Sequence, residues 1–192
     1  MIKRVILATA SLAALALVSA CGGPENDFEK AINTAFAEKK ECYSLTRQRE
    51  AKDFPLRIER GIMSRDEINP ILTGLQKAGM IDVKTSKERY KTTDHISITD
   101  KGLKNDVWHP KEGFCIGSPE VEEIVRFTYD QNGQNKERAR VELTWRLGNL
   151  PKWLDRDDFA DVDGMTTAQE GGAVVQKSSD GWHAMTSTGT FF

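Results

Sequence analysis

The feature that most constrains the fold is a strict two-residue repeat of apolar side chains over residues 138–147. The apolar members fall at every second position: Ala139, Val141, Leu143, Trp145 and Leu147. Successive side chains of a β-strand point to opposite faces, so this repeat predicts a strand with one buried face and one wet face. The wet face carries a stripe of three arginines, Arg138, Arg140 and Arg146.

Other segments of the second half also predict strands. We interpret residues 119–130 as an alternation of apolar and charged side chains, and the Asn-Gly pair within residues 131–135 is typical of a hairpin turn. A shorter hairpin is predicted for residues 173–177 and 181–185. Because isolated hairpins are only marginally stable in water, we expect these strands to share one small antiparallel sheet within residues 111–192.

The first half predicts short helices and a further hairpin. Residues 27–40 repeat apolar side chains at helical spacing, and Ser64 with Glu67 forms a capping-box pattern. Asn69-Pro70 is typical of a helix start, and Gly79 of its end. Residues 80–85 and 92–98 alternate as a hairpin, after which Thr99 can cap a last short helix. Residues 27–110 are therefore mixed helix and strand.

This order of elements carries a resemblance to a known fold. The spaced Leu72, Leu75 and Ala78, followed by the segment 95–102 (HISITDKG), resemble the core of winged-helix domains. The resemblance implies a winged-helix-like domain over residues 27–110, followed by the antiparallel β domain 111–192, in an α+β chain. The lysines of the predicted wing alternate with acidic residues, which is typical of a solvated face, so we expect no nucleic-acid partner.

The first 20 residues have the features of a secretory signal. Lys3 and Arg4 precede an apolar run over residues 5–18, and small residues follow it. A run of fourteen residues is too short to span a membrane as a helix. We therefore exclude residues 1–20 from the fold.

The sequence Val18-Ser19-Ala20-Cys21 resembles the lipobox of bacterial lipoprotein precursors. The resemblance implies cleavage before Cys21, acylation of Cys21 with chains such as palmitate, and a lipidated tether over residues 21–26. In Gram-negative lipoproteins, an aspartate directly after the lipidated cysteine favours retention in the inner membrane. This chain has Gly22 there, so the resemblance implies an outer-membrane anchor with the protein facing the periplasm. In a Gram-positive host the anchor would lie in the cytoplasmic membrane.

The other two cysteines, Cys42 and Cys115, are predicted to form a disulfide, since an exported protein meets an oxidising compartment. Two inert buried thiols or a metal pair are the alternatives. Removal of residues 1–20 also takes away two basic and no acidic side chains. The mature chain would then hold 25 basic and 29 acidic side chains in 172 residues, a formal charge of −4.

The chain shows no short motif of a catalytic or cofactor site. The serines lack a nucleophile elbow, and no zinc-protease or phosphate-loop pattern is present. His183 with Asp180 comes closest to a catalytic pair, but we predict no enzyme, no catalytic residue and no cofactor. Asp161, Asp163, Gly164 and Glu170 match four positions of a calcium loop, yet its first ligand position would be Phe159, so we predict no metal.

These observations favour a membrane-anchored lipoprotein that works by binding another protein. An inhibitor or immunity protein against an envelope-targeted toxin is one version, because a charge of −4 suits a basic partner. The alternatives are a structural or assembly lipoprotein of the envelope or of a secretion apparatus, and an envelope hydrolase.

We predict the contact surface in the aspartate-rich loop 150–164, where Trp153 and Phe159 would serve as aromatic anchors. The stripe of Arg138, Arg140 and Arg146 would join this surface if the two are adjacent. The alternative is that Trp153 and Phe159 close the open end of the sheet and only stabilise the fold.

Overall fold

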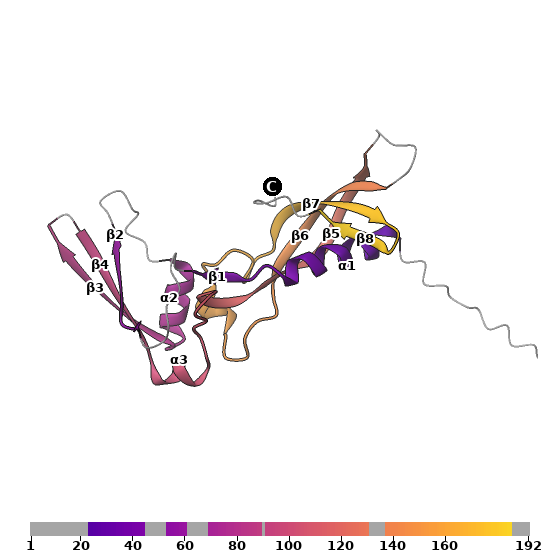
Figure 1. Cartoon of the computed structure of the whole chain (residues 1–192). Helices are drawn as coiled ribbons and strands as arrows, with labels where there is room; N and C mark the ends of the chain where they lie inside the picture. Colours follow the sequence, from indigo (N-terminus) through magenta and orange to yellow (C-terminus); the bar gives the residue numbers. More distant parts are fainter. Residues whose placement is uncertain (1–22, 45–52, 61–68, 90, 131–136, 186–192) are drawn as a thin grey trace, which may run out of the picture.

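A computed structural model describes residues 23–44, 53–60, 69–89, 91–130 and 137–185 (Figure 1). Within these ranges the chain is mixed α+β, and its strands pair antiparallel. The predicted signal, Cys21, the Ser64–Glu67 capping box and the turn at 131–135 lie outside the described residues.

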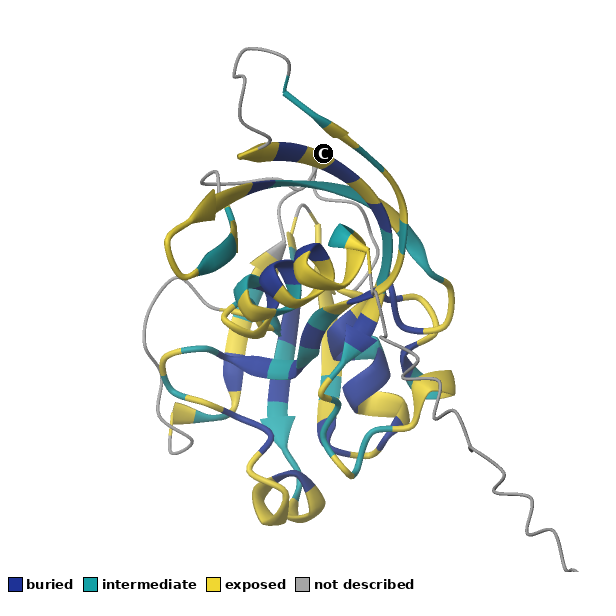
Figure 2. Cartoon of the chain, turned by 90° about the vertical axis from the view of Figure 1, so that its right-hand side faces the viewer, coloured by how far each residue is buried: buried dark blue, intermediate teal, exposed yellow. Residues whose placement is uncertain are grey.

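The larger sheet has five strands in the order β1-β5-β6-β7-β8. The strands are β1 (Glu41–Tyr43), β5 (Phe114–Tyr129), β6 (Arg138–Gly148), β7 (Gln169–Ser178) and β8 (Gly181–Ala184). The predicted strands of the second half therefore do share one antiparallel sheet. Helix α1 (Pro24–Ala37) packs against the inner face of this sheet, whose long strands curve over it (Figures 1 and 2).

The two-residue repeat of β6 produces the core under α1. Ala139 and Val141 are at most 2% exposed, and they pack with Leu143 against the apolar face of the helix. That face consists of Phe28, Ala31, Ile32 and Phe36, all of which are buried. Apolar side chains repeat every two residues on the strand and about every 3.6 residues on the helix. Each element therefore has one apolar surface, and the two surfaces pack together.

Two bulges let β5 keep its apolar residues on the inner face. Val121, Ile124 and Phe127 are three residues apart, which does not fit a regular strand. The register with β6 shifts between Val121 and Glu123 and again between Ile124 and Arg126. Each bulge inserts one extra residue and bends the strand, which gives the sheet its curvature over α1 (Figure 2).

The second sheet has three strands in the order β2-β4-β3, and lies at the far end of the molecule from β8 (Figure 1). Its strands are β2 (Leu56–Arg60), β3 (Ile81–Glu88) and β4 (Lys91–Ile98), flanked by α2 (Pro70–Lys77) and α3 (Asp100–Lys104). The side chain of Asn69 accepts a hydrogen bond from the amide of Ile71, and Thr99 accepts one from Gly102. Both predicted caps and the predicted hairpin are confirmed.

A winged-helix first half is not supported, since this half has few helices. Of the described helices, α2 and α3 are only eight and five residues long. The third, α1, lies on the five-stranded sheet, because that sheet covers its apolar face. Strand β1 also joins that sheet, by pairing with β5.

The two hydrophobic clusters both contain residues from either side of position 110. One joins α1 to β5, β6 and β7. The other joins α2 and the three-stranded sheet to the start of β5, the end of β6 and the short helix η2 (Arg156–Phe159). Segments 27–110 and 111–192 are thus packed into shared cores.

Candidate functional site

Phe159, predicted as a partner anchor, is a core residue. It is 1% exposed and lies against Gly74 of α2, where a side chain of any size would overlap its ring. Trp153 is half-buried, with its ring centroid 6.2 Å from that of Phe159. The loop therefore closes the gap between α2 and the end of β6, as in the alternative reading, and Phe159 offers no surface to a partner.

The arginine stripe is exposed, but each of its members already has a carboxylate partner. Arg138 and Arg140 lie 3.2 and 3.3 Å from the two carboxylate oxygens of Asp130, and Arg146 lies 2.8 Å from Glu122. Arg138 and Arg140 are at the start of β6, whereas the loop 150–164 follows its end. Of the stripe, only Arg146 lies beside the loop, where the amide of the next residue, Leu147, donates to the oxygen of Gly164 at 2.8 Å. The stripe as a whole therefore does not join the loop in one contact surface.

The acidic loop is fastened by an arginine that the sequence analysis did not single out. Arg156 donates to the backbone oxygens of Met165 and, at 2.8 Å, Leu147. Asp161 forms an ion pair with Lys77 of α2 at 3.8 Å. Among the described residues, no group of three or more histidine, cysteine or acidic side chains is placed to hold a metal ion.

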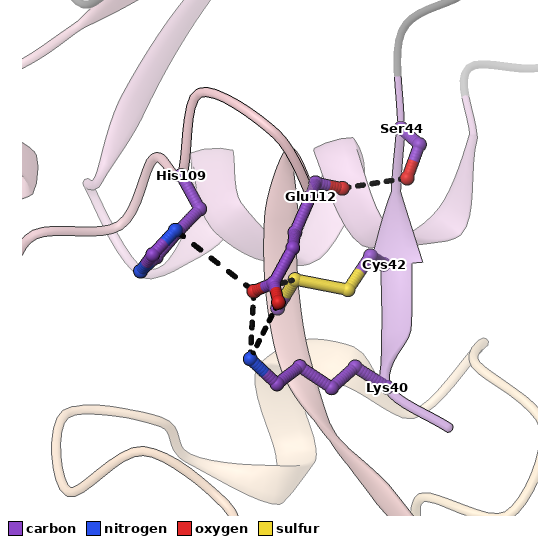
Figure 3. The surroundings of a disulfide bond; sticks show 6 residues. Lys40, Cys42, Ser44, His109 and Glu112 are labelled. Carbon is purple, nitrogen blue, oxygen red and sulfur yellow. Dashed lines mark hydrogen bonds and ion pairs between the residues drawn. A yellow bond between two sulfur atoms is a disulfide. The ribbon is translucent and has the colours of Figure 1, made fainter. Parts of the chain in front are cut away.

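The predicted disulfide between Cys42 and Cys115 is present. The two cysteines are direct register partners on the neighbouring strands β1 and β5. Ser44 donates to the backbone oxygen of Glu112 at 2.6 Å, and Lys40 donates to its carboxylate at 2.7 and 2.8 Å (Figure 3).

We call Lys40, Cys42, Ser44, Glu112 and Cys115 together the disulfide clasp. The hydrogen bond from Lys40, assisted by the charges of Lys40 and His109, holds the pKa of Glu112 below its ordinary value. A cavity of about 320 Å³ lies beside the clasp and is lined in part by Lys40, His109 and Cys115. The clasp fixes the segment that follows α1 to the start of β5, which is a structural role.

His183 and Asp180 are brought together at the turn between β7 and β8. His183 Nε2 lies 3.0 Å from Asp180 Oδ1, and Ser178 Oγ donates to the same oxygen at 2.5 Å. These two hydrogen bonds, that of Ser178 first, lower the pKa of Asp180. The cluster therefore stabilises the turn between β7 and β8.

A groove runs between α1 and β8, and we call it the α1–β8 groove. Its volume is about 560 Å³. One wall is a single stripe along α1, made of Asp27, Lys30, Ala31, Thr34 and Ala35, and extended by Glu38 directly after the helix. The other wall is Lys177 with the segment from Asp180 to Ala184. This groove could not be predicted from local sequence patterns, because it depends on which strand ends the sheet.

Trp182 lines the groove and packs against α1. Its ring meets Phe28 of α1 edge to face, with centroids 4.7 Å apart, and it remains partly exposed. Such an aromatic contact stabilises the packing of the helix on the strand beyond what the burial of apolar surface contributes. The groove therefore contains one half-exposed tryptophan, a residue type enriched at the energetic centres of protein interfaces.

Comparison of the chain with family models, curated proteins and solved structures gave no match. No helix in the described part of the chain is long and apolar enough to cross a membrane.

Proposed function

We propose that the protein is a lipoprotein, anchored through Cys21 and facing the periplasm, that binds another protein without chemistry of its own. The observation that carries this proposal is the α1–β8 groove. It combines a sheet edge, a half-exposed tryptophan and charges of both signs along a helix, a combination that suits a polypeptide.

The anchor bears on how the groove would be presented. Helix α1 begins at Pro24, three residues after Cys21. An extended chain spans at most about 3.6 Å per residue, so a lipidated Cys21 would keep the start of α1 within roughly 11 Å of the membrane surface. The groove, built on α1 and β8, would then lie near the membrane, with the three-stranded sheet further out (Figure 1).

Within this proposal, inhibition of an envelope-targeted toxin is the version we favour, because the mature charge of −4 suits a basic partner. An assembly role in the envelope or in a secretion apparatus is the alternative. Protection of a toxin-sensitive cell by the protein alone would support the inhibitor. If the protein does not protect the cell and instead captures a component of an envelope or secretion apparatus, the result would support the assembly role.

The anchoring is tested by Cys21→Ser. The variant cannot be acylated at this position, and we expect it to lose palmitate labelling and to leave the membrane fraction or remain uncleaved. One acyl chain gives only marginal binding, whereas two or three anchor firmly, so the change should be nearly complete. Wild-type fractionation of the variant would contradict lipidation.

Binding at the groove is tested by Thr34→Arg. Thr34 is exposed and lines the groove, so an arginine there fills the space without disturbing the core. We expect at least about a tenfold loss in affinity for the partner captured by wild-type protein, as for a change at an interface centre. The melting temperature should stay unchanged.

The matched control is Asn26→Arg, which adds the same side chain to an exposed position of α1 outside the groove lining. It should bind the partner as wild type does. Capture of the same partner at equal strength by Thr34→Arg would contradict a binding role for the groove.

A further inference from the structure

In the part of the chain that the structure describes, no strand pairs with the outer edge of β8. This free edge defines how a partner fits the groove, an inference that rests on the proposed protein-binding function. We propose that an extended segment of the partner polypeptide adds to β8 as a sixth strand, between β8 and the stripe of α1. β8 is the last strand of the sheet, and each of its residues lines the groove. Addition of a strand to such an edge is a general mode of peptide recognition.

The register shows which backbone groups are available. The amide of Met185 donates to the oxygen of Val174 at 2.7 Å. In an antiparallel pair, hydrogen-bonded and non-bonded positions alternate along each strand. The backbone N–H and C=O groups of His183 and Gly181 therefore also point toward β7. The backbone groups of Trp182 and Ala184 therefore point away from β7, to the free edge. A partner strand would bond to these two residues.

The two walls of the groove are matched in length. Asp27 and Glu38, at the two ends of the α1 stripe, are eleven residues apart, which is about 16 Å along a helix. The segment from Asp180 to Ala184 in the other wall has five residues. About five extended residues, at roughly 3.3 Å each, cover the same distance. The smaller residues Ala31, Thr34 and Ala35 lie between the ends and leave room for a backbone.

The charges of the helix wall give the segment its chemistry. Asp27 and Glu38 are exposed acids at the ends of the stripe, with exposed Lys30 between them. Within the described ranges, none of these three side chains has an ion-pair partner. A strand that carries basic residues at both ends and an acidic residue in the middle, all on one face, complements this wall.

The first arm of the test uses a defined peptide. The probe is the acetylated and amidated peptide Lys-Thr-Glu-Thr-Lys, whose charge pattern is the same in both strand directions. The control probe is the charge-reversed Glu-Thr-Lys-Thr-Glu. With the full detergent-solubilised chain, we expect the first probe to bind about fivefold more tightly. It should also slow hydrogen exchange at the amides of Trp182 and Ala184.

The second arm removes the backbone donor. Ala184→Pro deletes the amide that faces the free edge and leaves the bonds to β7 in place, as proline on an edge strand allows. We expect it to abolish probe binding, whereas Ala184→Thr, which keeps the amide, should bind the probe. If Ala184→Pro melts early, Thr34→Arg serves as the second blocking variant.

The outcomes separate the inference from the proposed function. Probe binding that survives in Ala184→Pro, or no slowing of exchange at residues 182 and 184, would overturn strand addition. Slowed exchange there that grows with protein concentration and without probe would show a second copy on this edge, and would also overturn it. A natural partner that depends on Thr34 but tolerates Ala184→Pro would uphold the groove while refuting the added strand.

Discussion

Replacement of Phe159 by alanine is expected to lower the free energy of unfolding by about 3–5 kcal/mol, the usual cost of a large cavity in a core. Phe159 is 1% exposed and fills the space above Gly74, in the cluster that joins α2 to the end of β6. Gly74 has no side chain, and the aromatic ring occupies the room this leaves. Neighbouring backbone cannot easily collapse into the space, so the cost should be near the upper part of the range.

Chemical denaturation of the variant and the wild type measures this cost. Trp153→Ala, in the same loop but half-buried, is the matched comparison and should cost about 1–2 kcal/mol. A loss of less than 1 kcal/mol for Phe159→Ala would contradict the core assignment. If either variant instead lost partner binding with unchanged stability, the loop 150–164 would be an interface after all.

Local patterns predicted individual elements well because each depends on neighbours in sequence. The repeat over residues 138–147 predicted β6, and Asn69 and Thr99 predicted two helix starts. The spacing of three between Val121, Ile124 and Phe127 also held information. Two bulges bring side chains with this spacing onto one face of the strand. The spacing could therefore have predicted the curvature of β5.

The assembly of these elements could not be predicted from local patterns. The apolar face of α1 fits any apolar surface, and nothing near it in sequence indicates that β6 covers it. The segment from Leu72 to Gly102 looks like a winged helix locally, but long-range pairing of β1 with β5 places the preceding helix elsewhere. Contacts between distant residues decided the fold.

The candidate site shows the same division. The disulfide followed from the number of cysteines and the inferred compartment. The α1–β8 groove did not, because an edge strand is defined by the order of the sheet. One signal was available: Ala31, Thr34 and Ala35 form a stripe of small residues along α1, with charged residues at both ends.

Removal of the disulfide is expected to lower the free energy of unfolding by about 4 kcal/mol, from the chain entropy that a cross-link over 73 residues withholds from the unfolded state. For a chain of this size the melting temperature should fall by about 8–16 °C. The variant of choice is Cys42→Ala with Cys115→Ala, which leaves no lone thiol. Dithiothreitol should bring wild-type protein to the same melting temperature and leave the double variant unaffected.

The rest of the clasp cannot replace the covalent bond. β1 has only three residues, and the ion pair between Lys40 and Glu112 is exposed, so it adds little. Ser44→Ala, which removes only the hydrogen bond to Glu112, is the matched control and should cost about 1 kcal/mol. Wild-type protein whose melting temperature does not respond to reduction would contradict this account.

Hydrogen exchange then distinguishes two ways in which the bond stabilises the protein. If it acts only on the unfolded chain, exchange through global unfolding should accelerate everywhere, while local opening at β1 stays the same. If it also holds the folded edge in place, the amides of β1 and of the first residues of β5 should exchange faster than those of β3 and β4. Because β1 is a short edge strand directly after α1, we expect the second pattern. Loosening there should extend to the Glu38 end of the α1–β8 groove before it reaches the three-stranded sheet.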